Sequence, residues 1–92
     1  MYDLEIKPEA DKIFKKLVKK NFKQLEIIHK KIKEIRETPY GYKFLRNPLN
    51  GFNRVHIDSN FVLIFRIDNI NRTIIVYYFD HHDSIYKWRP RE

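Results

Sequence analysis

With 92 residues the sequence predicts a single small domain, 1–92, because this length leaves no room for a second hydrophobic core. It contains no cysteine, no apolar run of roughly 18 residues and no leader-like first segment, which excludes disulfides, thiolate metal sites and a membrane span, so we expect a cytoplasmic protein. Nineteen lysine and arginine residues against twelve acidic ones give a net charge of +7, which favours a polyanionic partner such as nucleic acid or the ribosome. An acidic protein partner and a merely solvated, lysine-rich surface are the alternatives.

The first part of the chain predicts a strand followed by two helices. Residues 2–7 alternate apolar and polar side chains, which is the period of a half-buried strand. Pro8 suits the first turn of a helix, and apolar residues then recur at helical spacing over 10–18 and 25–35. Pro39 ends the second helix. We therefore expect a helical hairpin whose apolar stripes need a sheet to cover them.

The remainder of the chain predicts a sheet. Residues 40–51 hold both glycines and are turn-rich, with a short strand near 43–45. Three strand-like runs follow, FNRVHID, FVLIFRID and TIIVYYFD, separated by the turn segments SN and NINR. The last two runs are apolar on both faces and indicate central strands. The order predicts an α+β domain in which an N-terminal strand and a helical hairpin pack on a three- to four-stranded antiparallel sheet.

Polar side chains of the run FNRVHID indicate a possible ligand-binding face. The pleat of a strand puts Arg54 and His56 on one side and the apolar residues beside them on the other, which the helices would cover. A sheet face with a cation, an imidazole and an aromatic ring is one way in which small domains bind RNA, because cations meet phosphates and rings stack on bases. A solvated face without a ligand is the alternative.

The segment FDHHDSIY, residues 79–86, allows three interpretations. Metal binding by His81, His82 and Asp83 together with His56 is disfavoured, because neighbours on an extended chain point to opposite sides and no fixed ligand spacing is present. We therefore expect no metal and no other cofactor. Proton transfer is possible, since an exposed histidine titrates near neutral pH without adjustment. The third interpretation is an ordinary polar strand end.

Taken in order, these motifs resemble the RelE/ParE toxin superfamily of toxin–antitoxin systems. The resemblance rests on a short first strand, a basic helical hairpin, NPLNGFNRVHI, FVLIFRI and HHDSIY, and it covers almost the whole chain. The chain looks like an archaeal RelE-type toxin with features similar to the YafQ branch. RelE-type members are ribosome-dependent endoribonucleases that cut mRNA in the ribosomal A site, whereas ParE members poison DNA gyrase with much the same fold.

The resemblance implies roles for individual residues. His56 stands at the strand histidine of the YafQ pattern, and His82 and Tyr86 match its terminal histidine and aromatic residue. Phe61 falls where that branch has a tryptophan and would stack on a base. The resemblance therefore favours the nuclease over the gyrase poison.

Three positions depart from the family patterns. Asn47 and Asn60 stand where the YafQ pattern has histidine and aspartate, so two candidate proton-transfer groups are absent. Val62 falls where the RelE pattern has arginine, which removes a phosphate contact. A ParE-type gyrase inhibitor and a catalytically weak RNA-binding relative are therefore alternatives.

The mechanism that fits the resemblance needs no metal, because RNA carries its own nucleophile in the 2′-hydroxyl. His82 and His56 would transfer protons, Arg54 would stabilise the developing charge, and Tyr86 would orient the substrate or protonate the leaving group. The residues expected to bind RNA are Lys43, Arg46, Phe61 and Arg66. The expected partners are the ribosome, its mRNA and an acidic RelB-type antitoxin that folds on binding to give a hetero-oligomer.

Overall fold

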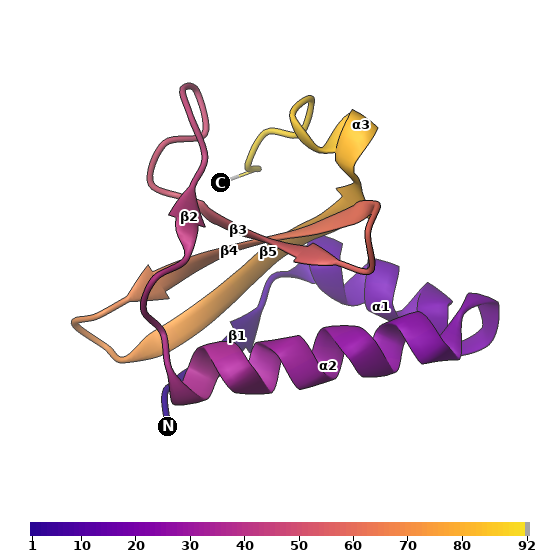
Figure 1. Ribbon diagram of the computed structural model, residues 1–92, viewed down its shortest axis with the longest axis horizontal. Helices are drawn as coiled ribbons and strands as arrows, with labels where there is room; N and C mark the ends of the chain where they lie inside the picture. Colours follow the sequence, from indigo (N-terminus) through magenta and orange to yellow (C-terminus); the bar gives the residue numbers. More distant parts are fainter. Residues whose placement is uncertain (92) are drawn as a thin grey trace.

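Residues 1–91, which the computed structural model describes, form a five-stranded sheet with two long helices packed along one face (Figure 1). The elements in chain order are β1 (Asp3–Ile6), α1 (Pro8–Lys20), α2 (Phe22–Glu37), β2 (Lys43–Phe44), β3 (Asn53–Ile57), β4 (Phe61–Asp68), β5 (Thr73–His81) and α3 (His82–Ile85). Over these residues no helix combines the length and the apolar character that a membrane span requires.

The strand order is β1-β5-β4-β3-β2. The last four strands pair antiparallel with their neighbours, as the runs and turns of the sequence predict. The first strand, β1, pairs with β5 in parallel at one edge. The α+β prediction is thus confirmed, with β1 as a fifth member of the same sheet. A parallel pair needs a long connection, which here is most of the chain, so no local pattern of the sequence reveals this pairing.

The helical hairpin turns at a single residue. The backbone N–H of Asn21 donates to the carbonyl oxygen of Leu17 at 2.9 Å and so closes α1. The Asn21 side chain accepts a hydrogen bond from the backbone N–H of Gln24 at 3.1 Å and caps α2. Asparagine is among the best residues at this position because its side-chain oxygen satisfies a free N–H at the helix start. The two helices therefore follow each other without a loop.

The larger hydrophobic core lies between the two helices and the sheet. Both helices contribute the apolar stripes that the helical spacing predicts, and β3, β4 and β5 contribute alternate residues from their inner face. Its buried members are Tyr2, Ala10, Phe14, Leu17, Leu25, Ile28, Ile32, Ile35, Ile57, Leu63, Phe65, Ile74, Val76 and Phe79.

A second apolar cluster covers part of the opposite face of the sheet, the face on which the sequence places Arg54 and His56. It joins the loop after β2, the outer face of β4 and β5, and the segment that begins with α3. In Figure 1 the loop after β2 and the α3 segment both rise on the side of the sheet away from α1 and α2. The buried members are Leu45, Leu49, Phe52, Val62, Ile64, Tyr77, Ile85 and Trp88. The polar residues of β3 consequently lie beside a second core rather than on a bare sheet.

A β-bulge in β5 supplies two aromatic residues to this second cluster. In the pairing of β4 with β5 the register shifts between Ile64, opposite Tyr78, and Phe65, opposite Val76, so Tyr77 is the additional residue. Because the extra residue interrupts the alternation of the strand, Tyr77 and Tyr78 both pack against the outer cluster. The bulge thereby enlarges the apolar surface of the sheet against which the C-terminal segment packs.

Candidate active site

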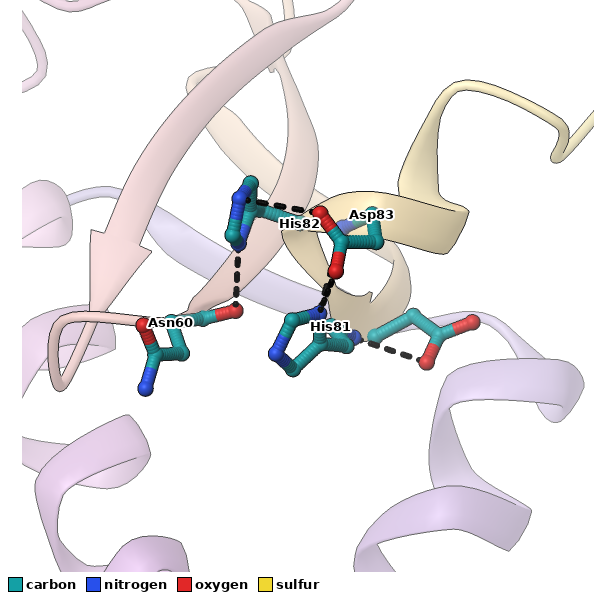
Figure 2. A network of polar contacts seen from close by, with 5 residues as sticks. Asn60, His81, His82 and Asp83 are labelled. Carbon is teal, nitrogen blue, oxygen red and sulfur yellow. Dashed lines mark hydrogen bonds and ion pairs between the residues drawn. The ribbon is translucent and has the colours of Figure 1, made fainter.

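His82 lies where β5 ends and α3 begins, and its ring is held from two sides (Figure 2). The backbone N–H of His82 donates to the carbonyl oxygen of Asn60 at 2.8 Å, which continues the pairing of β4 and β5 by one step. The ring atom Nδ1 lies 3.3 Å from the same oxygen, and Nε2 lies 3.1 Å from Oδ1 of Asp83. The side chain is 49% exposed, so the ring is only partly covered by the protein.

His81 and His82 lie side by side. Their ring centroids are 4.8 Å apart and the ring planes are inclined by 30°. The prediction that the two side chains point in opposite directions is wrong, because His82 is the first residue of α3 and the alternation of an extended strand ends before it. The argument against a metal site assumed that the two histidines point to opposite sides, so it no longer holds.

A cavity of about 390 Å³ brings together three of the residues that the sequence predicts for the site. Arg54 comes from β3, Arg46 from the loop after β2, and Tyr86 follows α3. Tyr86 is 55% exposed, so its ring is available to a ligand. Two guanidinium groups and a phenol around one cavity favour an anionic ligand such as a phosphate group.

Two further residues of this cavity were not among the residues predicted for binding. Phe44 is 66% exposed, and Asn47 lies in the turn that follows it. The sequence marks Asn47 only as a departure from the family pattern, and it offers no signal for Phe44 because a two-residue strand has no periodicity. Phe44 is an exposed aromatic ring beside the arginines, the position in which a base could stack.

Lys43 and His56 share the outer face of the sheet with Arg54. Lys43 is paired with Arg54 across β2 and β3, and directly opposite residues of an antiparallel pair project to the same side. His56, two residues after Arg54, is exposed and pairs with Val62 of the second cluster. The face assignment that the pleat predicts for Arg54 and His56 agrees with this register. Within residues 1–91, no hydrogen bond or ion pair joins His56 to His82.

Phe61 and Arg66 stand apart from the cavity. Phe61 lies on the inner face of the sheet, stacked on Phe79 with ring centroids 5.3 Å apart, and packs against the larger core. It pairs with Ile57 and His81, so the pleat directs it away from Arg54. The guanidinium of Arg66 lies over the Phe52 ring at 4.5 Å. Phe61 therefore lies on the face opposite to Arg54, and its stacking on RNA stays a prediction; the exposed rings beside Arg54 are Phe44 and Tyr86.

A larger cavity, of about 570 Å³, lies between the start of α1 and β5 and contains none of the predicted residues within the described chain. Tyr78 lines it, and its hydroxyl donates to Oδ2 of Asp80 at 3.0 Å. Burial and this neighbouring carboxylate raise the pKa of Tyr78 to about 12, so the phenol stays protonated at neutral pH. The larger cavity is also lined by cations and tyrosines, so we regard the smaller one as the candidate site because it holds Arg46, Arg54 and Tyr86, which the sequence predicts for the site.

Several solved toxin structures share this fold. A metal-bound toxin from Helicobacter pylori is 26% identical to the chain; the match covers 92% of this chain and 99% of the other, with a TM-score of 0.77. The toxin–antitoxin complex RelBE2 from Mycobacterium tuberculosis is 22% identical over 88% of this chain and 98% of the other, with a TM-score of 0.74. The arrangement of strands and helices is thus that of the RelE/YoeB/ParE toxins.

Comparison of sequences identifies the family. The model of the ParE toxin of type II toxin–antitoxin systems, parDE, matches residues 4–86. A Methanocaldococcus jannaschii protein named as toxin RelE4 is 55% identical over 87 residues, which cover 95% of this chain and 93% of that protein. The chain belongs to the ParE toxin family and is a toxin of a toxin–antitoxin system. The resemblance to the RelE/ParE superfamily that the motifs indicate is confirmed.

Proposed function

We propose that this toxin is a ribosome-dependent mRNA endoribonuclease of the cytoplasm, which inhibits translation by cutting mRNA through attack of the RNA 2′-hydroxyl on the adjacent phosphate. The observation that carries the proposal is the cavity in which Arg46, Arg54 and Tyr86 converge. A phosphate that becomes more negative in the transition state is stabilised by arginine side chains already oriented toward it. Lys43, opposite Arg54 in the register, would add a further positive charge at the same edge.

His82 is the proton-transfer group in this proposal. Its Nδ1 faces the Asn60 carbonyl oxygen, and hydrogen bonding of one ring nitrogen fixes the orientation in which the other meets a substrate. Nε2 lies 3.1 Å from Oδ1 of Asp83 on this half-exposed side chain, and in the proposal it is the atom that accepts or delivers the proton. His56, on the same sheet face as Arg54, is the second candidate. Because no hydrogen bond or ion pair joins the two histidines among the described residues, the bound RNA would have to lie across both.

Gyrase inhibition is the second candidate function, and one observation favours it. The family model that matches the chain is that of the parDE toxin, the branch whose resemblance implies a gyrase poison rather than a nuclease. In addition, Asn47 and Asn60 replace residues that could transfer protons in the YafQ pattern. A protein-binding poison would need the basic surface but no proton-transfer chemistry.

Two parallel assays separate these functions. We expect the purified wild-type toxin to cut a reporter mRNA in a translating extract, at sites that primer extension maps within the open reading frame, and to leave the same RNA intact when ribosomes are absent. In the second assay, DNA supercoiling by purified gyrase should proceed normally with the toxin present. Arrest of gyrase without any RNA cleavage would reject the nuclease and support the second candidate.

The proposed partner is an acidic antitoxin segment that is disordered alone and folds on the toxin. The net charge of +7 supports this, and the fold is shared with the toxin of the RelBE2 toxin–antitoxin complex. We expect the chain to arrest growth when expressed alone and to co-purify with the acidic product of an adjacent gene when both are expressed. Gel filtration should then give a mass above that of the toxin alone. A toxin that always elutes as a monomer in the presence of that product would contradict the proposal.

A further inference from the structure

The imidazole rings of His81 and His82 and the carboxylate of Asp83 meet at the junction of β5 and α3. The proposed catalysis uses only the His82 ring. Figure 2 shows the Asp83 carboxylate between the rings of His81 and His82, with one oxygen directed to each. Oδ2 of Asp83 lies 3.4 Å from Nδ1 of His81, and Oδ1 lies 3.1 Å from Nε2 of His82. The potential ligand atoms of the three residues all lie within 4.8 Å of one another.

The other hydrogen bonds of the two rings place lone pairs opposite the carboxylate. Nδ1 of His82 faces the Asn60 carbonyl oxygen, which only accepts, so that nitrogen carries the proton of a neutral ring and Nε2 carries a lone pair. Nδ1 of His81 accepts the backbone N–H of Asp83 at 3.2 Å, so it too presents a lone pair. In the neutral rings both nitrogens therefore face a carboxylate oxygen without a hydrogen between them. A cation located between the three groups removes this repulsion.

We infer that His81, His82 and Asp83 form a binding site for a divalent d-block cation of the Zn²⁺ or Cu²⁺ kind. Ligand atoms at roughly 2.0–2.2 Å from a tetrahedral ion lie about 3.3 Å from each other. The 3.1 Å between Nε2 of His82 and Oδ1 of Asp83 is close to that value, and Nδ1 of His81 lies 3.4 Å from the other oxygen of the same carboxylate. Two imidazole nitrogens and one carboxylate oxygen select such ions over Mg²⁺ and Ca²⁺, which take oxygen ligands.

The second ring nitrogen of His82 also has the kind of partner that metal-binding histidines usually have. Histidines that bind metals usually donate their second ring N–H to a carbonyl or carboxylate group, which fixes the ring, and the Asn60 carbonyl oxygen is placed to do this for His82. Binding at Nδ1 of His81 would replace the hydrogen bond that this atom accepts from the Asp83 N–H. Three protein ligands leave the remaining position of a tetrahedral ion to water.

Isothermal titration of the wild-type toxin with Zn²⁺ tests the site. We expect one ion per chain, and affinity lower by at least about tenfold in His81→Asn and in Asp83→Asn, since loss even of an outer partner of a metal ligand costs about 10–100-fold. The matched control is His29→Asn, which removes another exposed histidine on α2, far along the chain from the cluster. Its affinity should equal that of the wild type.

Three results would overturn the inference: no heat of binding at millimolar Zn²⁺, equal affinity of His81→Asn and the wild type, or an equal loss in His29→Asn. Circular dichroism of each variant shows that the fold is retained, as expected for exposed side chains. These readouts do not depend on enzymatic activity, so they stay separate from the success or failure of the proposed nuclease.

Metal binding at this site should also inhibit the nuclease, an expectation that rests on the proposed function. A metal ion at Nε2 of His82 occupies the lone pair that proton transfer needs, so Zn²⁺ should inhibit mRNA cleavage by the wild type. The His81→Asn variant should need at least about tenfold more Zn²⁺ for the same inhibition, in line with its weaker binding. Inhibition that is identical in both proteins, despite different affinities in the titration, would show that the ion does not act through His82.

Discussion

Replacing His82 with alanine is expected to lower mRNA cleavage in a translating extract by about 10²–10⁴-fold, the range that general acid–base groups contribute. The ring is half exposed and opposes the Asn60 carbonyl, so its loss removes the proton-transfer group without opening the core. Stability should change by only about 0.5 kcal/mol, as for other substitutions at exposed positions. The backbone N–H of residue 82, which continues the sheet pairing, is retained in the variant.

The matched control for this experiment is His81→Ala. His81 caps α3 through Nδ1, which accepts the Asp83 N–H, and the family resemblance matches only His82. We therefore expect cleavage by His81→Ala to stay close to that of the wild type, although the two rings are neighbours. Cleavage by the wild type should also persist in a chelator, because the proposed chemistry uses no metal. Normal cleavage by His82→Ala would contradict the mechanism, and loss of wild-type cleavage in a chelator would make the metal part of it.

Trp88→Ala is expected to lower the free energy of unfolding by about 3–5 kcal/mol, the cost of deleting a large buried aromatic side chain. The indole is 8% exposed and stacks on Tyr78 with ring centroids 5.4 Å apart. It also meets Phe52 edge-on at 5.5 Å, and its Nε1 donates to Oε1 of Glu9 at 2.9 Å. Loss of the ring would therefore detach the C-terminal segment from both the sheet and α1. Urea unfolding followed by circular dichroism measures the change.

Trp88→Phe separates the packing of the ring from its hydrogen bond. Phenylalanine keeps an aromatic ring in the second cluster but cannot donate to Glu9, whose side chain is 31% exposed and can be hydrated instead. We expect a cost of roughly 1 kcal/mol for the lost hydrogen bond, plus a smaller term for the reduced volume. A Trp88→Ala variant as stable as the wild type would show that the second cluster does not hold the C-terminal segment in place.

The second cluster links stability to the proposed site, since Ile85 and Trp88 flank Tyr86 in sequence and both are buried. Tyr86, which lines the cavity, lies one position after Ile85 and two before Trp88, so both buried residues hold the segment that carries it. Partial loss of cleavage in Trp88→Ala would thus arise from displacement of Tyr86 and would be accompanied by reduced stability. His82→Ala differs in kind, because there activity falls while stability does not.

Much of the secondary structure could be predicted because each element carries its own periodicity. The spacing of Phe14 and Leu17, and later of Ile28, Ile32 and Ile35, marks the buried stripes of α1 and α2. The alternation in β3 correctly separates Arg54 and His56 from the buried Ile57. The same pleat groups Phe61 with the inner face, where it packs against the larger core, while the stacking role that the family resemblance implies for it stays a prediction.

The site could be predicted only in part, because its residues come from segments without periodicity. Arg46 and Asn47 lie in a turn, Phe44 in a two-residue strand and Tyr86 just beyond a single helical turn. Nothing in these short stretches indicates that they face one cavity, and the resemblance supplied only Tyr86 as part of a motif. The contact of His81 with His82 was missed for a related reason, since a change from strand to helix at one residue reverses the expected direction of a side chain.

Residue periodicity and charge were enough to predict the helical hairpin, the two central strands and a basic protein, and the order of the motifs was enough for the resemblance to the toxin superfamily. The tertiary structure decided the parallel pairing of β1 with β5, the second cluster on the outer face, and the meeting of Arg46, Arg54 and Tyr86. The division has a physical reason: periodicity records which side of its own element a residue occupies, a local property of the backbone. Which distant segment covers that side depends on the free energy of burying apolar surface between residues far apart in the chain, which only the folded molecule resolves.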